Sequence, residues 1–250
     1  MHTDKVRFAV LAALLLVTAS TLAHEGHSGG LKANESPDVA PSFDIVHAKV
    51  SVKDNRAHFH MASRGAAGSE KPQAQGQLGG SEVYSYVWPT TIGPEAVGFA
   101  ANSGILALAV TIHPDFDDTP LFDENRDNNT ENDGDTWHSH WVVLAPDPKC
   151  GDNNLGVVDI PEGATPPLPA TWPGLPLLID SPGWQPVFGD HSVDVHLAFN
   201  KTIDLDNSRY DGVTAALRVN ESIHAPLLCV ENVFDTASGD LSLPADIERH

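Results

Sequence analysis

The sequence has little sulfur. Its 250 residues include two cysteines and two methionines beside 13 histidines. This composition argues against a thiolate-based metal site and favours imidazole and carboxylate ligands, which suit Cu(II), Zn(II) or Ni(II).

Positive charge is also scarce. Fourteen Lys and Arg residues face 34 Asp and Glu residues, which gives a formal net charge of −20. A nucleic-acid backbone or an anionic membrane surface would repel such a chain, whereas metal cations would be attracted to it. We therefore expect metal ions as partners and no nucleic acid.

Long hydrophobic runs are missing except near the N-terminus. Lys5 and Arg7 precede an apolar run over 8–17, and small residues stand at Thr21 and Ala23. This pattern predicts a signal peptide over 1–23, too short to span a membrane, and no transmembrane segment after its cleavage. We expect a periplasmic or secreted protein. In such an oxidising compartment, Cys150 and Cys229 should form a disulfide.

The remaining chain is typical of an all-β protein. Residues 24–41 are polar and aperiodic, which predicts a flexible arm that carries histidine, and 42–250 should form one domain. Within this domain, short segments rich in β-branched and aromatic residues alternate with Gly, Pro, Asn and Asp. They predict an antiparallel β-sandwich of about seven to nine strands with long irregular loops, the strands being 43–52, 56–62, 82–88, 104–112, 137–145, 155–160, 191–199, 213–219 and 227–233. A hairpin turn at 53–55 should join the first two. The proline-rich segment 161–186 should form no regular sheet, and Trp172 and Trp184 could line a cleft there.

Two His-x-His motifs are the main candidates for chemistry. His58 and His60 lie in one predicted strand, and His138 and His140 lie in another. Residues i and i+2 of a strand project from the same face, so each motif presents two imidazoles side by side. Ala57, Phe59 and Met61 alternate with the first pair, which predicts that both of its histidines lie opposite the core.

Two further histidines could join these pairs. Through the hairpin, His47 could approach His58 or His60, and His113 stands at a strand end, where metal ligands are common. If the two His-x-His strands paired in one sheet, their histidines could share a single ion, but the sequence does not establish that pairing. His224 and His250 are interpreted as structural or solvated.

Cleavage after Ala23 would leave His24 at the new N-terminus. Its α-amine and imidazole could chelate copper, and in this one residue the chain resembles the histidine brace of lytic polysaccharide monooxygenases and of some CopC-like copper carriers. Trp137 and Trp141 flank the second histidine pair, so the chain is also similar to the methanotroph MopE-type copper-binding proteins. These resemblances imply copper, with a tryptophan-derived ligand in the MopE type.

The acidic segment 115–135 predicts a different ion. Its Asp and Asn oxygens stand on a loop that contains glycine, an arrangement that suits Ca²⁺. The candidate calcium ligands are Asp123, Asn125, Asp127, Asp133 and Asp135. The D-x-N-x-D spacing starts like an EF-hand loop, but position twelve is Gly134 and no flanking helices are expected. A solvated loop with Asx turns is the alternative.

The chain lacks the main enzyme signatures. It has no G-x-S-x-G elbow, no phosphate loop, no dinucleotide fingerprint and no Cys-x-x-Cys motif. We therefore expect a metal-binding protein that buffers or delivers copper, or else zinc, in the periplasm through strand histidines, with a metal donor or acceptor protein as partner. Two alternatives stay open. One is a copper-dependent oxidoreductase that uses the His24 brace, and the other is a carbohydrate- or protein-binding module in which Trp88, Trp172 and Trp184 stack on a ligand.

Overall fold

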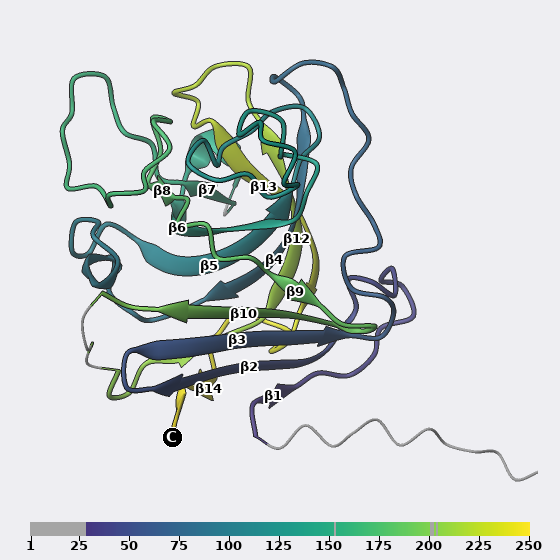
Figure 1. Cartoon of the computed structure of the whole chain (residues 1–250). Coiled ribbons are helices and arrows are strands. Elements are labelled where there is room, and N and C mark those ends of the chain that lie inside the picture. Colours follow the sequence, from purple (N-terminus) through teal and green to yellow (C-terminus); the bar gives the residue numbers. More distant parts are fainter. Residues whose placement is uncertain (1–28, 153, 201–202, 204) are drawn as a thin grey trace, which may run out of the picture.

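The computed structural model describes residues 29–152, 154–200, 203 and 205–250, which form an all-β structure (Figure 1). Two 3₁₀ turns are the only helical elements of this part of the chain, η1 (Pro94–Ala96) and η2 (Pro148–Cys150). Across the same ranges, no helix has the length and apolar character needed to cross a bilayer. The predicted signal peptide and His24 lie outside the described residues.

One sheet is open and has six strands. Its order is β1-β2-β3-β10-β9, and β15 adds to β2 as the parallel pair in an otherwise antiparallel sheet. The strands are β1 (Leu31–Lys32), β2 (Ile45–Lys53), β3 (Arg56–Ser63), β9 (Val187–Phe188), β10 (Ser192–Ala198) and β15 (Glu248–Arg249). The predicted hairpin joins β2 to β3, and Asp54 takes the positive φ of 57° that so tight a turn requires.

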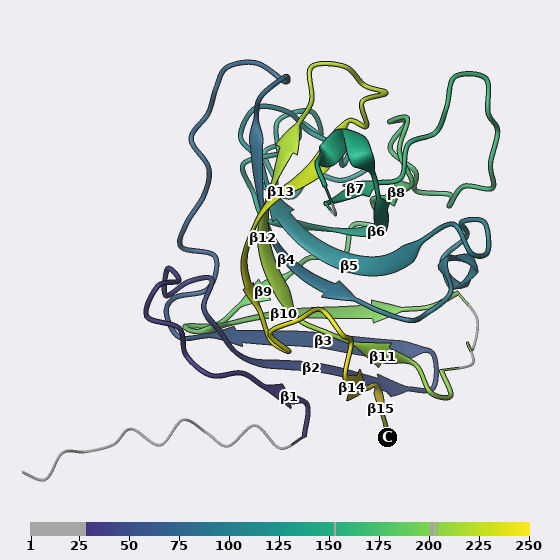
Figure 2. The same cartoon turned by 180° about the vertical axis from the view of Figure 1, so that it is seen from behind.

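The second sheet closes on itself. Its order is β5-β4-β12-β13-β7-β6-β8, and β5 also pairs with β6, so that six strands complete a barrel. The strands are β4 (Glu82–Pro89), β5 (Ile105–Ile112), β6 (His138–Pro146), β7 (Leu155–Val157), β8 (Ile179–Asp180), β12 (Val213–Val219) and β13 (Leu228–Thr236). A small third sheet pairs β11 (Arg209–Tyr210) with β14 (Ala245–Asp246). Both views show the barrel lying on the open sheet (Figures 1 and 2).

All nine predicted strands are present, and so is the antiparallel all-β class. The predicted sandwich is only a coarse description, because one of its layers is a closed barrel. The physical reason lies in strands that are apolar on both faces. On β5, Leu106, Leu108 and Val110 point out of the barrel, while Ala107 and Ala109 point into it. Small inward side chains let the strands close around a narrow interior.

Large aromatic side chains fill the core between the open sheet and the barrel. Phe59 of β3 meets Trp88 of β4 and Trp141 of β6, with ring centroids 5.9 and 5.8 Å apart. All three side chains are fully buried. Ala57 and Met61 lie on the same inner face of β3, as predicted, so His58 and His60 lie on its outer face.

The predicted disulfide is present. Cys150, at the end of η2, is bonded to Cys229 of β13 across 79 positions of sequence. It links the β6–β7 connection to another strand of the barrel.

The proline-rich segment departs from its prediction in one place. Within 161–186, β8 forms and pairs with the middle of β6, so this part of the segment is regular sheet. Asp180 of β8 is buried beside Thr171, whose hydroxyl donates a 2.6 Å hydrogen bond to Oδ1. Burial raises the pKa of Asp180 to about 6, although hydrogen bonds from Thr171 and the Ser181 backbone act in the opposite direction.

This raised pKa predicts a pH-dependent stability that Asp180→Asn should remove. Between about pH 4 and pH 6 the folded chain keeps a proton on Asp180 that the unfolded chain has lost, so stability falls as the pH rises. We expect Asp180→Asn to be more stable than the wild type at pH 7, by at most about 3 kcal/mol, and equal to it below pH 4. Urea unfolding of both proteins from pH 4 to pH 7 measures the difference. A difference that does not change with pH would contradict this account.

Candidate metal centre

Three histidines meet at one end of the barrel interior. His138 and His140 project inward from β6, which is buried on both faces. His113 follows the end of β5 and continues the inward row of Ala109 and Thr111. Thr111 pairs with His138 in the register of β5 and β6, so His113 lies diagonally across from His138. The barrel register therefore brings together imidazoles that are 25 residues apart in sequence.

A carboxylate completes this group. Asp118 comes from the loop after β5, and its Oδ1 lies 3.2 Å from His113 Nε2, 3.1 Å from His138 Nε2 and 3.3 Å from His140 Nε2. The Nε2 atoms of His113 and His138 are 3.0 Å apart. The exposed fraction is 1% for each of the three histidine side chains and 3% for Asp118. We call these four residues the buried centre.

The hydrogen-bond partner of the outward nitrogen, Nδ1, determines which nitrogen of each ring carries the proton. His113 Nδ1 lies 2.9 Å from the Phe116 carbonyl oxygen, and His138 Nδ1 lies 2.7 Å from that of Thr136. A carbonyl oxygen only accepts, so both Nδ1 atoms are donors. His140 Nδ1 lies 3.1 Å from Ser181 Oγ, whose own proton goes to the Asp118 carbonyl. In the neutral state, all three Nε2 atoms therefore present lone pairs to the shared point.

The electrostatics of this arrangement favour a cation. Burial raises the pKa of Asp118, but His140, His113 and His138 together lower it well below its usual range, so the carboxyl is ionised. Burial lowers the pKa of His138, yet its interactions with Asp118 outweigh burial and the net shift is upward. For His140, burial prevails and the pKa is lowered. The Asp118 carboxylate and the inner nitrogens of three imidazoles thus meet in a buried site. The Thr111 hydroxyl lies 3.1 Å from His138 Nε2 and can donate to it, and a proton or a metal ion would compensate the other groups.

The spacing fits a four-coordinate metal ion. Bonds of about 2.0 Å in a tetrahedron place neighbouring ligand atoms about 3.3 Å apart. In a square plane, one partner of Asp118 Oδ1 would lie opposite it, at about 4.0 Å. The three distances from this oxygen span 3.1 to 3.3 Å and so match the tetrahedron. The hydrogen bonds at each Nδ1 supply the outer contacts that hold metal-ligating histidines in orientation.

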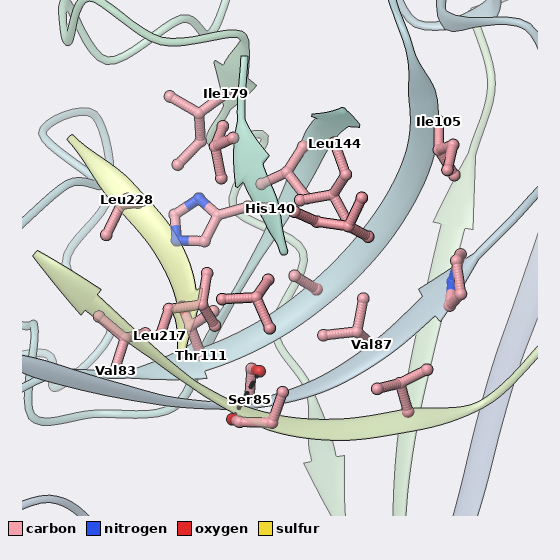
Figure 3. Close-up of a pocket in the computed structure, with 18 of the residues that line it drawn as sticks. Val83, Ser85, Val87, Ile105, Thr111, His140, Leu144, Ile179, Leu217 and Leu228 are labelled. Carbon is pink, nitrogen blue, oxygen red and sulfur yellow. Dashed lines mark hydrogen bonds between the residues drawn. The ribbon is translucent and has the colours of Figure 1, made fainter. Parts of the chain in front are cut away.

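The barrel interior next to the buried centre is apolar. A cavity of about 110 Å³ is lined by small aliphatic side chains from the barrel strands, together with His113, Asp118 and His140. Figure 3 shows His140 among these side chains, with Leu144, Leu217 and Leu228 nearby. Such apolar surroundings strengthen the electrostatic interaction of the ligands with an ion.

The first histidine pair lies elsewhere. His58 and His60 belong to the open sheet, whereas His138 and His140 belong to the barrel, so the two motifs do not share an ion. Asp194 of β10 contacts both histidines of the first pair. Burial raises the pKa of Asp194, but these contacts lower it below its usual range. His47 reaches the same region, with its ring centroid 5.4 Å from that of His60, as the hairpin predicted.

Four of the five calcium candidates use their side-chain oxygens within the loop. Asp123 accepts hydrogen bonds from the backbone of Asp127 and Asn128, and buried Asp133 accepts from Glu124 and Asn125. Asn125 and Asp127 form Asx turns, because each accepts from the backbone N–H two residues on. Asp135 instead lies 3.7 Å from Lys71. Two groups among the described residues bring three or more candidate ligand atoms together, and neither contains these five residues. Calcium stays a prediction.

The tryptophans do not form the predicted ligand platform. Trp88 is fully buried against Phe59, so it cannot stack on a ligand. Trp184 lines a hollow of about 350 Å³ with Asp180 and Phe199, but Trp172 is not part of that lining. Of the two tryptophans predicted to line a cleft, Trp184 lines this hollow.

Sequence reasoning singled out His113, His138 and His140 but missed Asp118 as a ligand. Asp118 stands in the acidic segment assigned to calcium, where its neighbours Asp115 and Asp117 have the same chemistry. Its position five residues after a histidine at a strand end was the available signal. Ser181, which contacts His140, had no sequence signal at all because it lies 41 residues away.

Comparison with protein-family models, with curated proteins and with solved structures found no match for this chain. The resemblance to CopC-like and MopE-type proteins therefore stays a prediction, and the buried centre is interpreted from its own geometry.

Ser181→Ala should weaken metal binding at the buried centre while leaving the fold intact. The hydroxyl orients His140, and loss of such an outer contact typically costs 10- to 100-fold in affinity, which we expect here. Ser139→Ala is the matched control, because Ser139 is equally buried on β6 but bonds to the Trp184 carbonyl instead of a ligand. Competition against a chromophoric chelator measures both variants. Equal losses in the two variants would contradict an orienting role.

Proposed function

We propose that this chain is an exported transition-metal-binding protein that holds one ion between His113, Asp118, His138 and His140. The observation that carries the proposal is the convergence of three Nε2 atoms on one carboxylate oxygen, at 3.1 to 3.3 Å, in an almost completely buried site. An ordinary buried histidine has its two nitrogens satisfied by protein groups. Here the inner nitrogens converge on one carboxylate oxygen, and His140 Nε2 has no hydrogen-bond partner among the described residues.

The tetrahedral spacing favours an ion with a filled d shell. Zn(II) has no geometric preference of its own and is usually tetrahedral in closed sites. Copper, which the sequence predicts, fits less well, because Cu(I) prefers sulfur ligands, which this site lacks, and Cu(II) prefers tetragonal sites. We therefore propose that the resident ion is zinc.

Coordination by four protein ligands, with no position left open, supports binding rather than catalysis. Catalytic zinc sites keep a position open for water or substrate, while four protein ligands are typical of sites that hold the ion firmly. The ligands join the loop after β5 to the barrel wall, so binding also stabilises that loop. A periplasmic donor or acceptor protein would have to reach the ion through a movement of this loop, since the ligands themselves are covered.

The competing functions have less support. An oxidoreductase with a histidine brace depends on His24, which lies outside the described residues. A module that binds its ligand by stacking could not use Trp88, because this side chain is fully buried. The disulfide between Cys150 and Cys229 is compatible with export.

Elemental analysis of the protein secreted from its own signal, without a histidine tag, tests the proposal. After exhaustive dialysis we expect about one equivalent of zinc. Asp118→Asn, which keeps the side-chain size but removes the charge, and His138→Ala/His140→Ala should each lose most of it. Stoichiometric metal in both variants would refute the assignment.

A control and a spectroscopic measurement sharpen this experiment. His224→Ala removes a histidine outside the buried centre and should leave the retained metal unchanged. A filled d shell is silent in electron paramagnetic resonance. A strong Cu(II) signal that disappears in Asp118→Asn would overturn the choice of ion while keeping the site.

A further inference from the structure

The outer face of the open sheet carries a second group of imidazoles around a carboxylate. His58 and His60 of β3 lie directly opposite His196 and Asp194 of β10, respectively. These neighbouring strands are labelled in Figure 1. The alternate residues of both strands point into the core, where Phe59 and Val195 are fully buried. The pairing of β3 with β10 therefore gathers these polar side chains on one face.

Both imidazoles of β3 point at one oxygen. His58 Nε2 lies 2.7 Å and His60 Nδ1 lies 2.8 Å from Asp194 Oδ1. The other oxygen, Oδ2, accepts a 3.1 Å hydrogen bond from Ser192 Oγ, which orients the carboxylate. One ligand atom from each of His58, His60 and Asp194 lies within 4.8 Å of the others. Small rotations about χ1 and χ2 would let all three atoms contact an ion at bonds of about 2 Å.

Further imidazoles surround this group. The ring of His196 stacks on that of His58 with centroids 4.2 Å apart, and the ring of His47 lies on the other side, next to His60. Lys49, which is paired with His60 in the register of β2, directs its ammonium group to Glu248 at 2.9 Å. The ammonium group of Lys49, opposite His60, is thus paired with the Glu248 carboxylate of β15.

Exposure separates this group from the buried centre. The exposed fraction is 36% for the His58 side chain, 22% for Asp194 and 13% for His60, against 1 to 3% for the buried ligands. A partly exposed group with two imidazoles and one carboxylate leaves coordination positions for water or for another ligand. Such a site can exchange its ion with solution.

We propose that His58, His60 and Asp194 form a second, exchangeable metal site that takes a divalent ion such as Cu(II), with His196 available as an additional ligand. Nitrogen and oxygen donors with free positions suit the tetragonal preference of Cu(II). The net charge of −20 increases the local concentration of such cations. This site shares no residue with the buried centre and does not depend on its occupancy.

Cu(II) titration of the dialysed full-length protein tests the second site. We expect the wild type to bind one more equivalent of Cu(II) than His58→Ala/His60→Ala, and Asp194→Ala to bind that equivalent at least about tenfold more weakly. Electron paramagnetic resonance should show nitrogen ligation that is lost in the double variant. An N-terminal site at His24 would persist in these variants, so it does not obscure the difference.

Asp159→Ala is the matched control. Asp159 and His224 form a pair with a similar distance, 2.9 Å, and similar exposed fractions, 22% and 38%, but with one imidazole instead of two. Its substitution should leave Cu(II) binding unchanged. Equal Cu(II) binding in the wild type and the His58→Ala/His60→Ala variant would overturn the proposal, and so would an equal loss in Asp159→Ala. Asp118→Asn should keep the exchangeable equivalent, so failure of the buried centre and failure of this site give different results.

Discussion

The central constraint on this molecule is the meeting of three imidazole lone pairs and one carboxylate in a buried site. His113, Asp118, His138 and His140 are almost completely buried, and their inner atoms are too close together to remain uncompensated. Without a proton or a metal ion, the Asp118 carboxylate would leave negative potential inside an apolar barrel. The loop after β5, the outer hydrogen bonds of the rings and the closed end of the barrel all depend on how this potential is neutralised.

The barrel can host such a group because its strands are apolar on both faces. Large residues such as Trp141 point toward the open sheet, and small residues such as Ala107 and Ala109 point inward. The same alternation directs His138 and His140 into the narrow interior. A two-sheet sandwich with one wet face would have placed these histidines in solvent, where water would satisfy their nitrogens.

The two histidine groups differ in ways that match different tasks. The buried centre gathers four candidate ligands from β6 and the segment after β5, and its inner nitrogens are oriented by hydrogen bonds at the outer ones. The group around Asp194 lies on paired strands and is partly exposed. A buried set of four ligands slows the exchange of a metal ion with solution, whereas a partly exposed set of ligands permits it. We therefore propose that one chain combines a site suited to retention with a site suited to exchange.

The sequence alone determined the strands, their class and the disulfide, because period-two apolar patterns and turn residues are local signals and only two cysteines are present. It also determined that each His-x-His motif shares one face. Tertiary structure decided which residues meet. Barrel closure placed His113 beside His138, a loop delivered Asp118, and β10 brought Asp194 to His60. These contacts depend on strand register and loop path over long sequence separations, which no local pattern encodes.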